Sequence, residues 1–438
     1  MKRWKIAITV ASALFTFELH AEPHELNAVA SDPQAMGWMV GFPPPPEKVI
    51  APPLSNFMSF PKLRWAFCHM REMQATKRVS RGVESPSALL EQLDPAIDDL
   101  RFTPIGADKE MTWRESLDAN YTDGILVMHQ GKIIYEYYSG CLNREGRHGA
   151  MSVTKSFVGT VAEILIADGT LDGDAPVTKY VPELKSSAFG SATVRQVMDM
   201  TTGLDFNEDY ADPNADIWAY AAAGDPTPKP ADYKGARNFF EYLQGVKKAG
   251  EHGVAFTYKS VNTDALAWTI ARASGKDFVE HLSERIWKPL GMEQEADMMV
   301  DSIGTPLSAG GLNLGLRDAA RFGQTMLQNG VFEGKQVIPE SVVASIAAGG
   351  DQKKFAGAGY STLPDGSYRS QWWVLHNEHK AYSARGIHGQ AIYVDPAAQM
   401  VIARFATYPI SANAYIDPTS LPAYQAVADY LVNKYSKP

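Results

Sequence analysis

The chain has 438 residues, of which 45% are hydrophobic, 11% aromatic and 21% charged. These fractions are ordinary for globular proteins, and they exclude long disordered, collagen-like, coiled-coil and multi-span membrane chains. The net charge is −9, and no cluster of Lys and Arg interrupts the acidic balance. The composition therefore argues against nucleic acid and anionic membrane surfaces as partners.

The first 21 residues have the pattern of a secretory signal peptide. A basic segment at residues 1–5 precedes an apolar stretch over residues 6–17, and cleavage is expected after Ala21. A membrane anchor is the alternative, but the apolar stretch is shorter than the roughly 20 residues that a spanning helix needs. We expect a periplasmic or secreted protein without a stable membrane anchor.

The chain contains two cysteines, Cys68 and Cys141. In an oxidising compartment they can form one disulfide, whereas two buried free thiols are the alternative, and the sequence leaves both open. Neither the cysteines nor the histidines have the spacing of a metal site, and the motif HExxH is absent. We expect neither a metal nor a cofactor.

Residues 22–108 are rich in proline and irregular in pattern. Four consecutive prolines at 43–46 favour an extended conformation, and aromatic residues recur around them without a clear period. Those aromatic side chains need a surface on which to be buried. We therefore expect an N-terminal arm that packs on a main body formed by residues 109–438.

The main body opens with a predicted β-hairpin, whose strands span 124–129 and 132–138 and meet at Gln130-Gly131. A helix is predicted over 152–168, ended by Gly169. Helical spacing then dominates from about 170 to 330. Helices are expected there over 193–200, 236–246, 261–273, 277–287 and 316–328.

A long loop over 201–235 separates the first two of those helices. Structureless loops of that length in a compact domain are more often functional than idle. Strands return over 370–376, 382–394 and 400–407, before a closing helix over 418–435. This order predicts an α/β (α+β) fold, in which an antiparallel sheet built from two distant parts of the chain is flanked by helices and interrupted by an inserted helical region.

The sequence Ser152-Val-Thr-Lys155 carries the first chemical signal. Residues three apart on a helix share one face, so Lys155 can take the proton of the Ser152 hydroxyl if burial lowers the pKa of its amine. Ser152 also lies at the expected helix start, where free backbone N–H groups favour a developing oxyanion. The same spacing recurs at Ser59 and Lys62, but Pro61 disfavours a helix there and no hairpin precedes it.

Two further segments hold candidate site residues. Tyr258 and Ser260 lie just before a predicted helix, where a phenol can relay protons and a small hydroxyl can bind substrate. Taken alone, a tyrosine at position 258 is more often a half-buried packing residue. The segment 384–390 lies inside the predicted strand 382–394, and Gly386 there suggests a close approach of the backbone to a ligand. His388 alone fits a structural histidine better than a catalyst.

In this order and spacing, these elements resemble the serine β-lactamase and penicillin-binding-protein superfamily. Within it, the chain is most similar to the class C β-lactamase-related branch, and to 6-aminohexanoate-dimer (nylon-oligomer) hydrolases and related carboxylesterases. The resemblance extends from about residue 123 to the C-terminus. It includes the segments 200–204, 258–264 and 309–312, and the Pro-rich stretch at 37–46.

The resemblance implies a role for each candidate. Ser152 is the acylated nucleophile, Lys155 its base, and Tyr258 the group that passes a proton to the leaving group. The oxyanion hole is formed by the backbone N–H groups of Ser152 and Ile387. Tyr210, in the long loop, contacts the leaving amide. Its alternative reading is an exposed loop aromatic. Substrate contacts are expected from Tyr210, Ser260, Gly386 and His388.

Two positions depart from the pattern of β-lactamases. Ser260 stands where Asn is usual, and Ala384-Arg385-Gly386 stands where Lys-Thr-Gly or His-Thr-Gly is usual. The missing cationic or imidazole group helps those enzymes to recognise the β-lactam carboxylate, which places β-lactamase activity in doubt. Arg385 offers a charge, but the alternation of a strand points neighbouring side chains to opposite faces.

The leading hypothesis is thus a secreted serine hydrolase that cleaves a small-molecule amide or ester through an acyl-enzyme. A β-lactamase or D-amino-acid peptidase of the same fold is one alternative. A penicillin-binding protein or sensor that acylates slowly is another. Steady turnover of a generic ester distinguishes an enzyme from a sensor, because a sensor stops after one equivalent.

Overall fold

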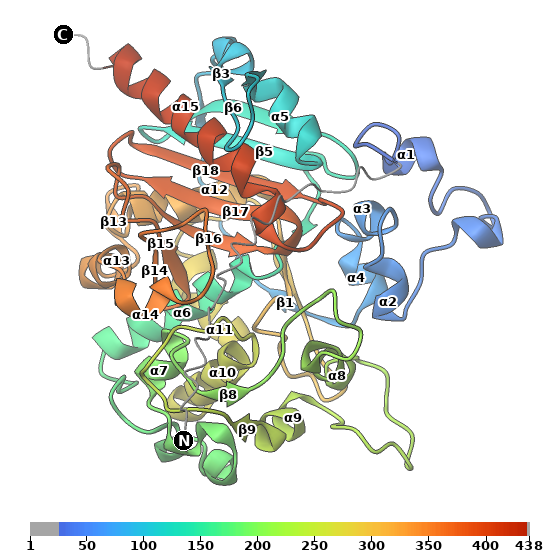
Figure 1. Ribbon diagram of the computed structural model, residues 1–438, viewed down its shortest axis with the longest axis vertical. Helices are drawn as coiled ribbons and strands as arrows, with labels where there is room; N and C mark the ends of the chain where they lie inside the picture. The colour runs from blue at the N-terminus through green and yellow to red at the C-terminus, as the bar shows by residue number, and fades with distance from the viewer. Residues whose placement is uncertain (1–25, 436–438) are drawn as a thin grey trace, which may run out of the picture.

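The computed structural model describes residues 26–435 (Figure 1). The predicted signal peptide lies outside the described residues. Across 26–435, every helix is too short or too polar to cross a membrane.

An eight-stranded sheet forms the centre of the molecule, in the order β14-β15-β16-β17-β18-β5-β6-β2. At its middle, β5 from the first third of the chain pairs with β18 from the C-terminal part, with Val127 opposite Ile402. This confirms the predicted sheet of two distant halves. The strands are β2 (Leu90–Glu91), β5 (Thr122–His129), β6 (Lys132–Tyr138), β14 (Ser367–Arg369), β15 (Trp372–Val374), β16 (Tyr382–Gly386), β17 (Gln390–Asp395) and β18 (Met400–Ala406).

The hairpin of β5 and β6 is confirmed where the sequence predicted it. Gln130 and Gly131 both have positive φ, at 49° and 79°, so the two-residue turn has the left-handed conformation that matches the twist of the flanking strands. All eight residues of β5 are buried because the strand is covered on both faces. The sheet is therefore sandwiched between helical layers.

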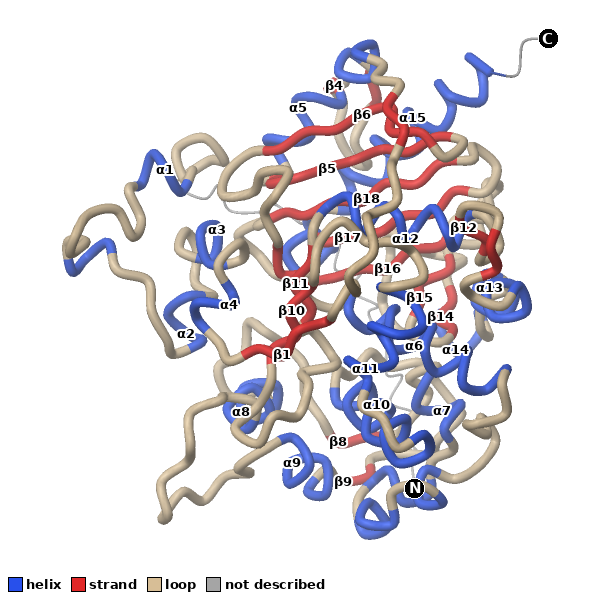
Figure 2. The backbone as a smooth tube through the Cα atoms, turned by 180° about the vertical axis from the view of Figure 1, so that it is seen from behind, coloured by secondary structure: helices blue, strands red, loops and turns tan. Residues whose placement is uncertain are grey.

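The two faces of the sheet are covered by different helices (Figure 2). On one face, α15 (Asp417–Tyr435) and α5 (Trp113–Ala119) share an apolar cluster with β5 and β18, which includes Tyr424 and Val427 of α15. On the other face lie α6 (Val153–Ala167), α12 (Leu316–Leu327) and α13 (Glu340–Ala347). The predicted closing helix and the predicted helix after the hairpin are both confirmed.

The helical region beyond α6 contains the predicted helices, most of them shorter than predicted. They are α7 (Val194–Met198), α9 (Phe239–Gly245), α10 (Val261–Ser274) and α11 (Phe278–Leu282), the last continued by a π-helical turn over Ser283–Trp287. The long loop over 201–235 is not structureless, because it contains β8 (Leu204–Asp205) and α8 (Asp216–Ala223). The strand β8 pairs with β9 (Lys247–Lys248).

A second sheet of four strands, in the order β1-β10-β11-β7, was not predicted. Its strands have two to four residues each and those of the body are buried, so the sequence lacks the alternation that marks a half-exposed strand. The strands are β1 (Thr76–Val79), β7 (His148–Gly149), β10 (Ala296–Met299) and β11 (Leu312–Leu314). This sheet lies directly before and beside the start of α6.

The single strand predicted over 382–394 is wrong. The chain reverses at a 3₁₀ turn over Ile387–Gly389, and β16 and β17 pair as an antiparallel hairpin. His388 and Gly389 have φ values of 62° and 100°, which an extended strand excludes. Apolar residues continue on both sides of the turn, which hides it in the sequence.

The segment from residue 26 to 108 lies against the body through short elements. Its buried aromatic side chains, among them Phe57 and Phe67, cluster with Met151 and Met299 of the body. A disulfide joins Cys68 to Cys141, with the two Cα atoms 5.9 Å apart. The segment contains α1 (Pro33–Met36), α2 (Leu54–Phe57), α3 (Leu63–Ala66), α4 (Met70–Met73), β1, β2 and β3 (Arg101–Phe102).

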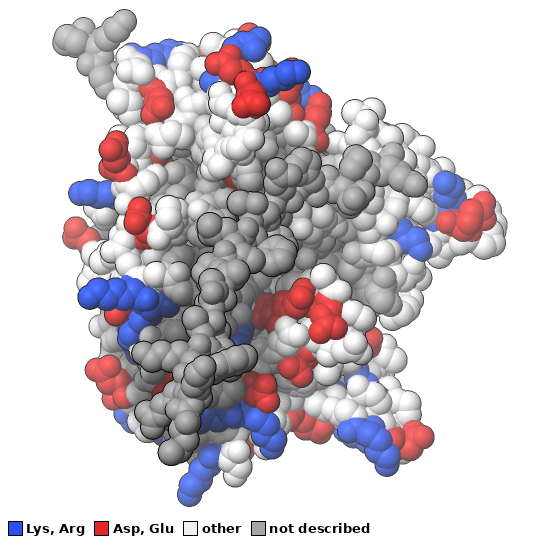
Figure 3. All heavy atoms as spheres, viewed as in Figure 1, with Lys and Arg blue, Asp and Glu red and all other residues white. Residues whose placement is uncertain are grey.

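The remaining elements lie at the periphery. They are β4 (Met111–Thr112), which pairs with β3, the hairpin of β12 (Val331–Phe332) and β13 (Lys335–Gln336), and α14 (Gln352–Ala356). On the face drawn in Figure 3, side chains of both charge signs are interspersed.

Candidate active site

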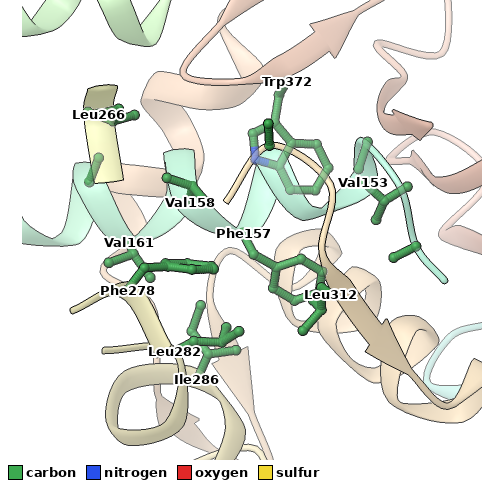
Figure 4. Close-up of a cluster of buried hydrophobic side chains, with 14 of the residues drawn as sticks. Val153, Phe157, Val158, Val161, Leu266, Phe278, Leu282, Ile286, Leu312 and Trp372 are labelled. Carbon is green, nitrogen blue, oxygen red and sulfur yellow. The ribbon is translucent and has the colours of Figure 1, made fainter. Parts of the chain in front are cut away.

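The helix that carries Ser152 and Lys155 is buried along most of its length. Its apolar side chains, among them Val153, Phe157 and Val161, pack between the sheet residue Trp372 and the helical residue Phe278 (Figure 4). Burial on all sides leaves α6 little freedom to shift. The two polar side chains at its start are therefore held in a fixed place.

Ser152 occupies the N-cap of α6, but its hydroxyl does not cap the helix. Instead, the amine Nζ of Lys155 lies 2.8 Å from Ser152 Oγ and donates a hydrogen bond to it. The same amine donates to the carbonyl oxygen of Ala309, at 2.7 Å. Met151, just before Ser152, has a φ of 47°, a left-handed conformation that costs free energy in a non-glycine residue and is frequent at functional turns.

The environment of Lys155 favours its neutral form. Its side chain is 1% exposed, and burial lowers the pKa of Lys155 to about 8, although the carboxylates of Glu208 and Asp264 oppose this by raising it. Roughly one tenth of the amine is thus unprotonated at pH 7, far more than for an ordinary lysine. Its proximity to Ser152 Oγ then makes it a competent general base.

Tyr258 is brought to the same point from just before α10. The Lys155 amine lies 5.0 Å from the centroid of the Tyr258 ring. Burial raises the pKa of Tyr258 well above its usual value, while its hydrogen bond with Ser152 lowers it. The ring stacks on Trp373, with centroids 5.4 Å apart. The phenol therefore remains protonated at neutral pH and is held beside the nucleophile.

Gly386 at the end of β16 approaches the start of α6 closely. A Cβ atom at this position would lie 2.8 Å from the Ala150 carbonyl oxygen and 3.1 Å from the Ser152 backbone nitrogen. Only glycine fits such an approach without displacing backbone. The backbone at Gly386 thus lies next to the Ser152 N–H group, which makes the adjacent Ile387 N–H a candidate for the second donor to an oxyanion.

Ser260 and Tyr210 meet at a carboxylate that the sequence analysis missed. Glu208, half-buried in the long loop, accepts hydrogen bonds from the Ser260 hydroxyl at 2.6 Å and from the Tyr210 hydroxyl at 3.3 Å. It also accepts one from the Ser260 backbone N–H. Burial raises the pKa of Glu208, and the nearby Lys155 lowers it. The loop is thereby attached to the second motif.

His388 and Arg385 make contacts with other parts of the protein. The His388 ring is buried, with Nδ1 2.6 Å from the Tyr408 carbonyl oxygen, and burial lowers the pKa of His388 to about 4. These contacts favour a structural role, and substrate binding by His388 stays a prediction. The guanidinium of Arg385 forms an ion pair with Asp417 and lies 5.4 Å from the centroid of the Trp373 ring.

The competing pair at Ser59 and Lys62 does not form a hydrogen-bonded unit. The Ser59 hydroxyl donates to the Asn56 carbonyl oxygen at 2.6 Å, and the Lys62 amine donates to the Asn56 side chain. Among the described residues, the cluster with the spacing of metal ligands is Cys68, Cys141 and His148, and the disulfide occupies both of its sulfur atoms.

Three residues of the candidate site were not singled out from the sequence. They are Glu208, Asp264 and Trp373. Asp264 belongs to the segment 258–264 that supported the resemblance, so its position was a usable signal. Glu208 lies between the segment 200–204 and Tyr210 in the sequence, but only the fold brings it and Trp373 to the other site residues. No local pattern marks them.

Comparison with known proteins places this geometry in a family. The family model described as Beta-lactamase matches residues 122–419. A 6-aminohexanoate-dimer hydrolase from Paenarthrobacter ureafaciens is 36% identical over 364 residues, which cover 82% of this chain and 88% of that protein. The esterase EstB from Burkholderia gladioli is 24% identical over 220 residues, or 46% of this chain and 53% of that protein.

A solved structure gives the same result at the level of the fold. A protein from Bacillus anthracis that is assigned as a 6-aminohexanoate-dimer hydrolase superposes with a TM-score of 0.78 at 32% identity, over 86% of this chain and 96% of that one. The chain therefore belongs to the Beta-lactamase family and is a serine hydrolase of that fold.

Proposed function

We propose that this protein is a secreted hydrolase that cleaves small linear amides or esters through an acyl-enzyme on Ser152. The observation that carries the proposal is the 2.8 Å hydrogen bond between the Lys155 amine and Ser152 Oγ, at a lysine whose pKa burial lowers to about 8. A lysine placed so deeply and so close to a serine has no evident structural purpose, because burying its charge costs stability.

Acylation begins when Lys155 takes the hydroxyl proton as Ser152 Oγ attacks the carbonyl carbon of the substrate. The backbone N–H groups of Ser152 and Ile387 donate hydrogen bonds to the resulting oxyanion. Tyr258 then gives its proton to the leaving nitrogen or oxygen as the bond to carbon breaks, and it recovers a proton from the Lys155 ammonium. The acyl group remains on Ser152 as an ester.

Deacylation repeats these steps with water as the nucleophile. Water attacks the acyl carbon while its proton passes to the Tyr258–Lys155 pair, and Ser152 Oγ departs and takes a proton back. The free acid leaves, and the site returns to its starting protonation. The high pKa of Tyr258 supports its use as a donor, and its contact with Lys155 supports its use as a relay.

The proposed substrate class rests on the third motif and the long loop. Ala384 is buried and offers no cation, and Arg385 is neutralised by Asp417. The loop instead brings the rings of Tyr210 and Trp218 together, with centroids 6.0 Å apart. Short acyl esters and linear ω-amino-acid amides fit these surroundings better than a β-lactam with a carboxylate. The names of the two relatives above support the same class.

Secretion is proposed from the N-terminal pattern and is supported by the disulfide, since such bonds persist in oxidising compartments. Two measurements test it. N-terminal sequencing of the exported protein should begin at Glu22, and non-reducing peptide mapping should recover a linked Cys68–Cys141 pair. A cytoplasmic protein with an intact N-terminus would refute export.

The acyl-enzyme is tested by labelling with a fluorophosphonate, followed by mapping of the adduct. The label is expected on Ser152, and steady turnover of p-nitrophenyl acetate is expected after the first equivalent. A label on Ser59 would refute the assignment of the nucleophile. A single burst without turnover would favour a slowly acylating sensor, and rapid release of D-alanine from muropeptides would favour a peptidase.

A further inference from the structure

Asp264 is a buried carboxylate to which the reaction as described assigns no task. It lies in the first turn of α10 and is 3% exposed. One carboxylate oxygen accepts a hydrogen bond from the Ser308 backbone N–H at 2.8 Å, and the other accepts one from the Tyr220 hydroxyl. Both oxygens are therefore occupied by groups from distant parts of the chain.

The first of these hydrogen bonds fixes the peptide that holds Lys155. Ser308 is followed by Ala309, whose carbonyl oxygen accepts a hydrogen bond from the Lys155 amine at 2.7 Å. The Ala309 N–H also acts on the Asp264 carboxylate. A path of two hydrogen bonds and one peptide thus connects Asp264 to the amine, which lies 2.8 Å from Ser152 Oγ.

The second hydrogen bond connects Asp264 to the long loop. Tyr220 belongs to α8, and its buried ring packs against Phe239 and Tyr242, with centroids 5.2 Å and 5.6 Å away. The same loop carries Glu208, whose charge acts on Lys155. Asp264, a residue of α10, is thus linked by hydrogen bonds both to Lys155 of α6 and to the loop.

We propose that Asp264 is a positioning residue that holds the Lys155 amine beside Ser152 through the Ser308–Ala309 peptide and secures α8 through Tyr220. It does not touch the reacting atoms, and it acts through the hydrogen bonds and the charge that it presents to Lys155. The inference rests on the proposed function, because it assigns Asp264 to the base of that reaction.

The charged and titratable groups around this point have identified partners. Burial raises the pKa of Asp264 to about 7, opposed first by its hydrogen bond with Tyr220 and then by the charge of Lys155. Glu208 faces Lys155 from the loop. Asp277, at the start of α11, lines a cavity of about 240 Å³ together with Asp264, and it is paired with Lys77. The carboxylate charges that act on Lys155 are thus those of Glu208 and Asp264.

The test is the pH dependence of kcat/KM for a p-nitrophenyl ester in Asp264→Asn. An asparagine keeps an acceptor for the Ser308 N–H but removes a negative charge near Lys155, so the ammonium form loses stabilisation. The acid limb of the profile, which is the part where kcat/KM rises with pH, should move to lower pH by about one unit. This is the low end of the effect of a neighbouring charge on a pKa. The rate of fluorophosphonate labelling should move in parallel, because it also requires the unprotonated amine.

Asp318→Asn is the matched control. Asp318 in α12 is also buried, accepts hydrogen bonds from the backbone N–H groups of Glu293 and Gln294 at 2.7 Å and 3.0 Å, and has its pKa raised by burial to about 6. Its replacement should lower stability and leave the acid limb in place. An unshifted limb in a folded Asp264→Asn protein would overturn the inference and reduce Asp264 to a structural anchor.

Tyr220→Phe provides an independent test should Asp264→Asn fail to fold. Removing the Tyr220 hydroxyl raises the pKa of Asp264, so the carboxyl is neutral over a wider range and the limb again moves down, by less than in Asp264→Asn. Tyr242→Phe is its control, because the Tyr242 hydroxyl donates to the Asp216 carbonyl oxygen and not to Asp264. Equal limbs in Tyr220→Phe and wild type would refute the inference.

The two proposals fail in different ways. If the wild-type protein is not labelled on Ser152, the proposed function is wrong, and the Asp264 variants carry no information about it. If the wild type is labelled and turns over ester while both variants keep its pH profile, the proposed function stands and only the role of Asp264 is refuted.

Discussion

The start of α6 and the loop over 201–235 contribute to the same site in different ways. Ser152 is 8% exposed and Lys155 1%, and their helix is packed on all sides. In the loop, Tyr210 and Trp218 are half-buried, and the residues between them are mostly exposed. Packed elements hold atoms within fractions of an ångström, whereas loops tolerate substitution. In the proposed function, the packed elements around α6 therefore carry the reaction, and the loop selects the substrate.

Hydrogen bonds attach the loop to α10 and to the residues just before it at several points. Glu208 binds Ser260 at the start of α10, and Tyr220 binds Asp264 in the same helix. The loop can therefore vary in its exposed part while these anchors keep it in register with Lys155. Substitutions of Ser152 or Lys155 at the start of α6 should therefore abolish the reaction, whereas substitutions in the loop should change its rate by modest factors.

The largest effect is expected for Ser152→Ala and Lys155→Ala, both of which should reduce ester turnover to background. Serine without a base is a weak nucleophile at neutral pH, and alanine at 152 has no nucleophile at all. Initial rates with p-nitrophenyl acetate measure the loss. Thermal unfolding provides the control, because a loss of activity is informative only where the variant is still folded. Full activity in either variant would refute the mechanism.

Tyr258→Phe should reduce kcat by about 10²–10⁴-fold, the range for one general acid–base group. Tyr368→Phe is a close control. Its ring packs edge-on against Tyr258, with centroids 6.1 Å apart, and its buried hydroxyl has no hydrogen-bond partner among the described residues. That variant should keep wild-type activity. A Tyr258→Phe enzyme within a few-fold of wild type would mean that Lys155 alone transfers the protons.

Between pH 6 and pH 9, kcat/KM should rise by roughly a hundredfold and then level off. The base must be neutral, and the pKa of Lys155 is lowered to about 8, so each unit below that value costs about a factor of ten in the active fraction. If the reaction required the ammonium form of Lys155 instead, kcat/KM would fall as the pH rises. Rates with an uncharged ester measure the limb directly. A profile that is flat, or that falls with rising pH, would exclude Lys155 as the base.

The fold was largely predictable from the sequence because its main elements have strong local signals. The hairpin at Gln130-Gly131 has the glycine turn and apolar strands, and α6 has a long apolar pattern. Two features lacked such signals. The turn at His388 lies between apolar strands that read as one, and the second sheet is assembled from strands too short to show a period.

The site was predictable only as far as its motifs extend. Ser152, Lys155 and Tyr258 were named because spacing and resemblance marked them, and the fold brings all three together. Glu208 and Trp373 could not be named, because their roles arise from long-range contacts that no local pattern encodes. The segment that contains Asp264 was identified from the sequence, but its link to Lys155 passes through the Ala309 carbonyl, which only the fold brings near.

Among substrates, kcat/KM for a short p-nitrophenyl ester should exceed that for a chromogenic cephalosporin by roughly 10–150-fold. This corresponds to one missing charge-assisted contact, of about 1.5–3 kcal/mol, with the β-lactam carboxylate. Ala384 supplies no cation, and Arg385 is paired with Asp417. Equal or higher activity on the cephalosporin would instead identify a β-lactamase, in which Arg385 or His388 recognises the carboxylate.

The smallest effect is expected in the loop itself. Tyr210→Phe removes a hydroxyl that donates to Glu208 at 3.3 Å and, in the proposed function, contacts the leaving amide. One neutral hydrogen bond contributes about 0.5–1.5 kcal/mol, so kcat/KM for a linear amide should fall by roughly 2–12-fold. An ester with an aryl leaving group presents no amide N–H and should be affected less. Tyr233→Phe, in the same loop but outside the Glu208 network, should leave both substrates unchanged. Equal losses on amide and ester would mean that Tyr210 supports the reaction itself and does not select the substrate. The loop over 201–235 and the packed elements around α6 would then no longer have separate roles.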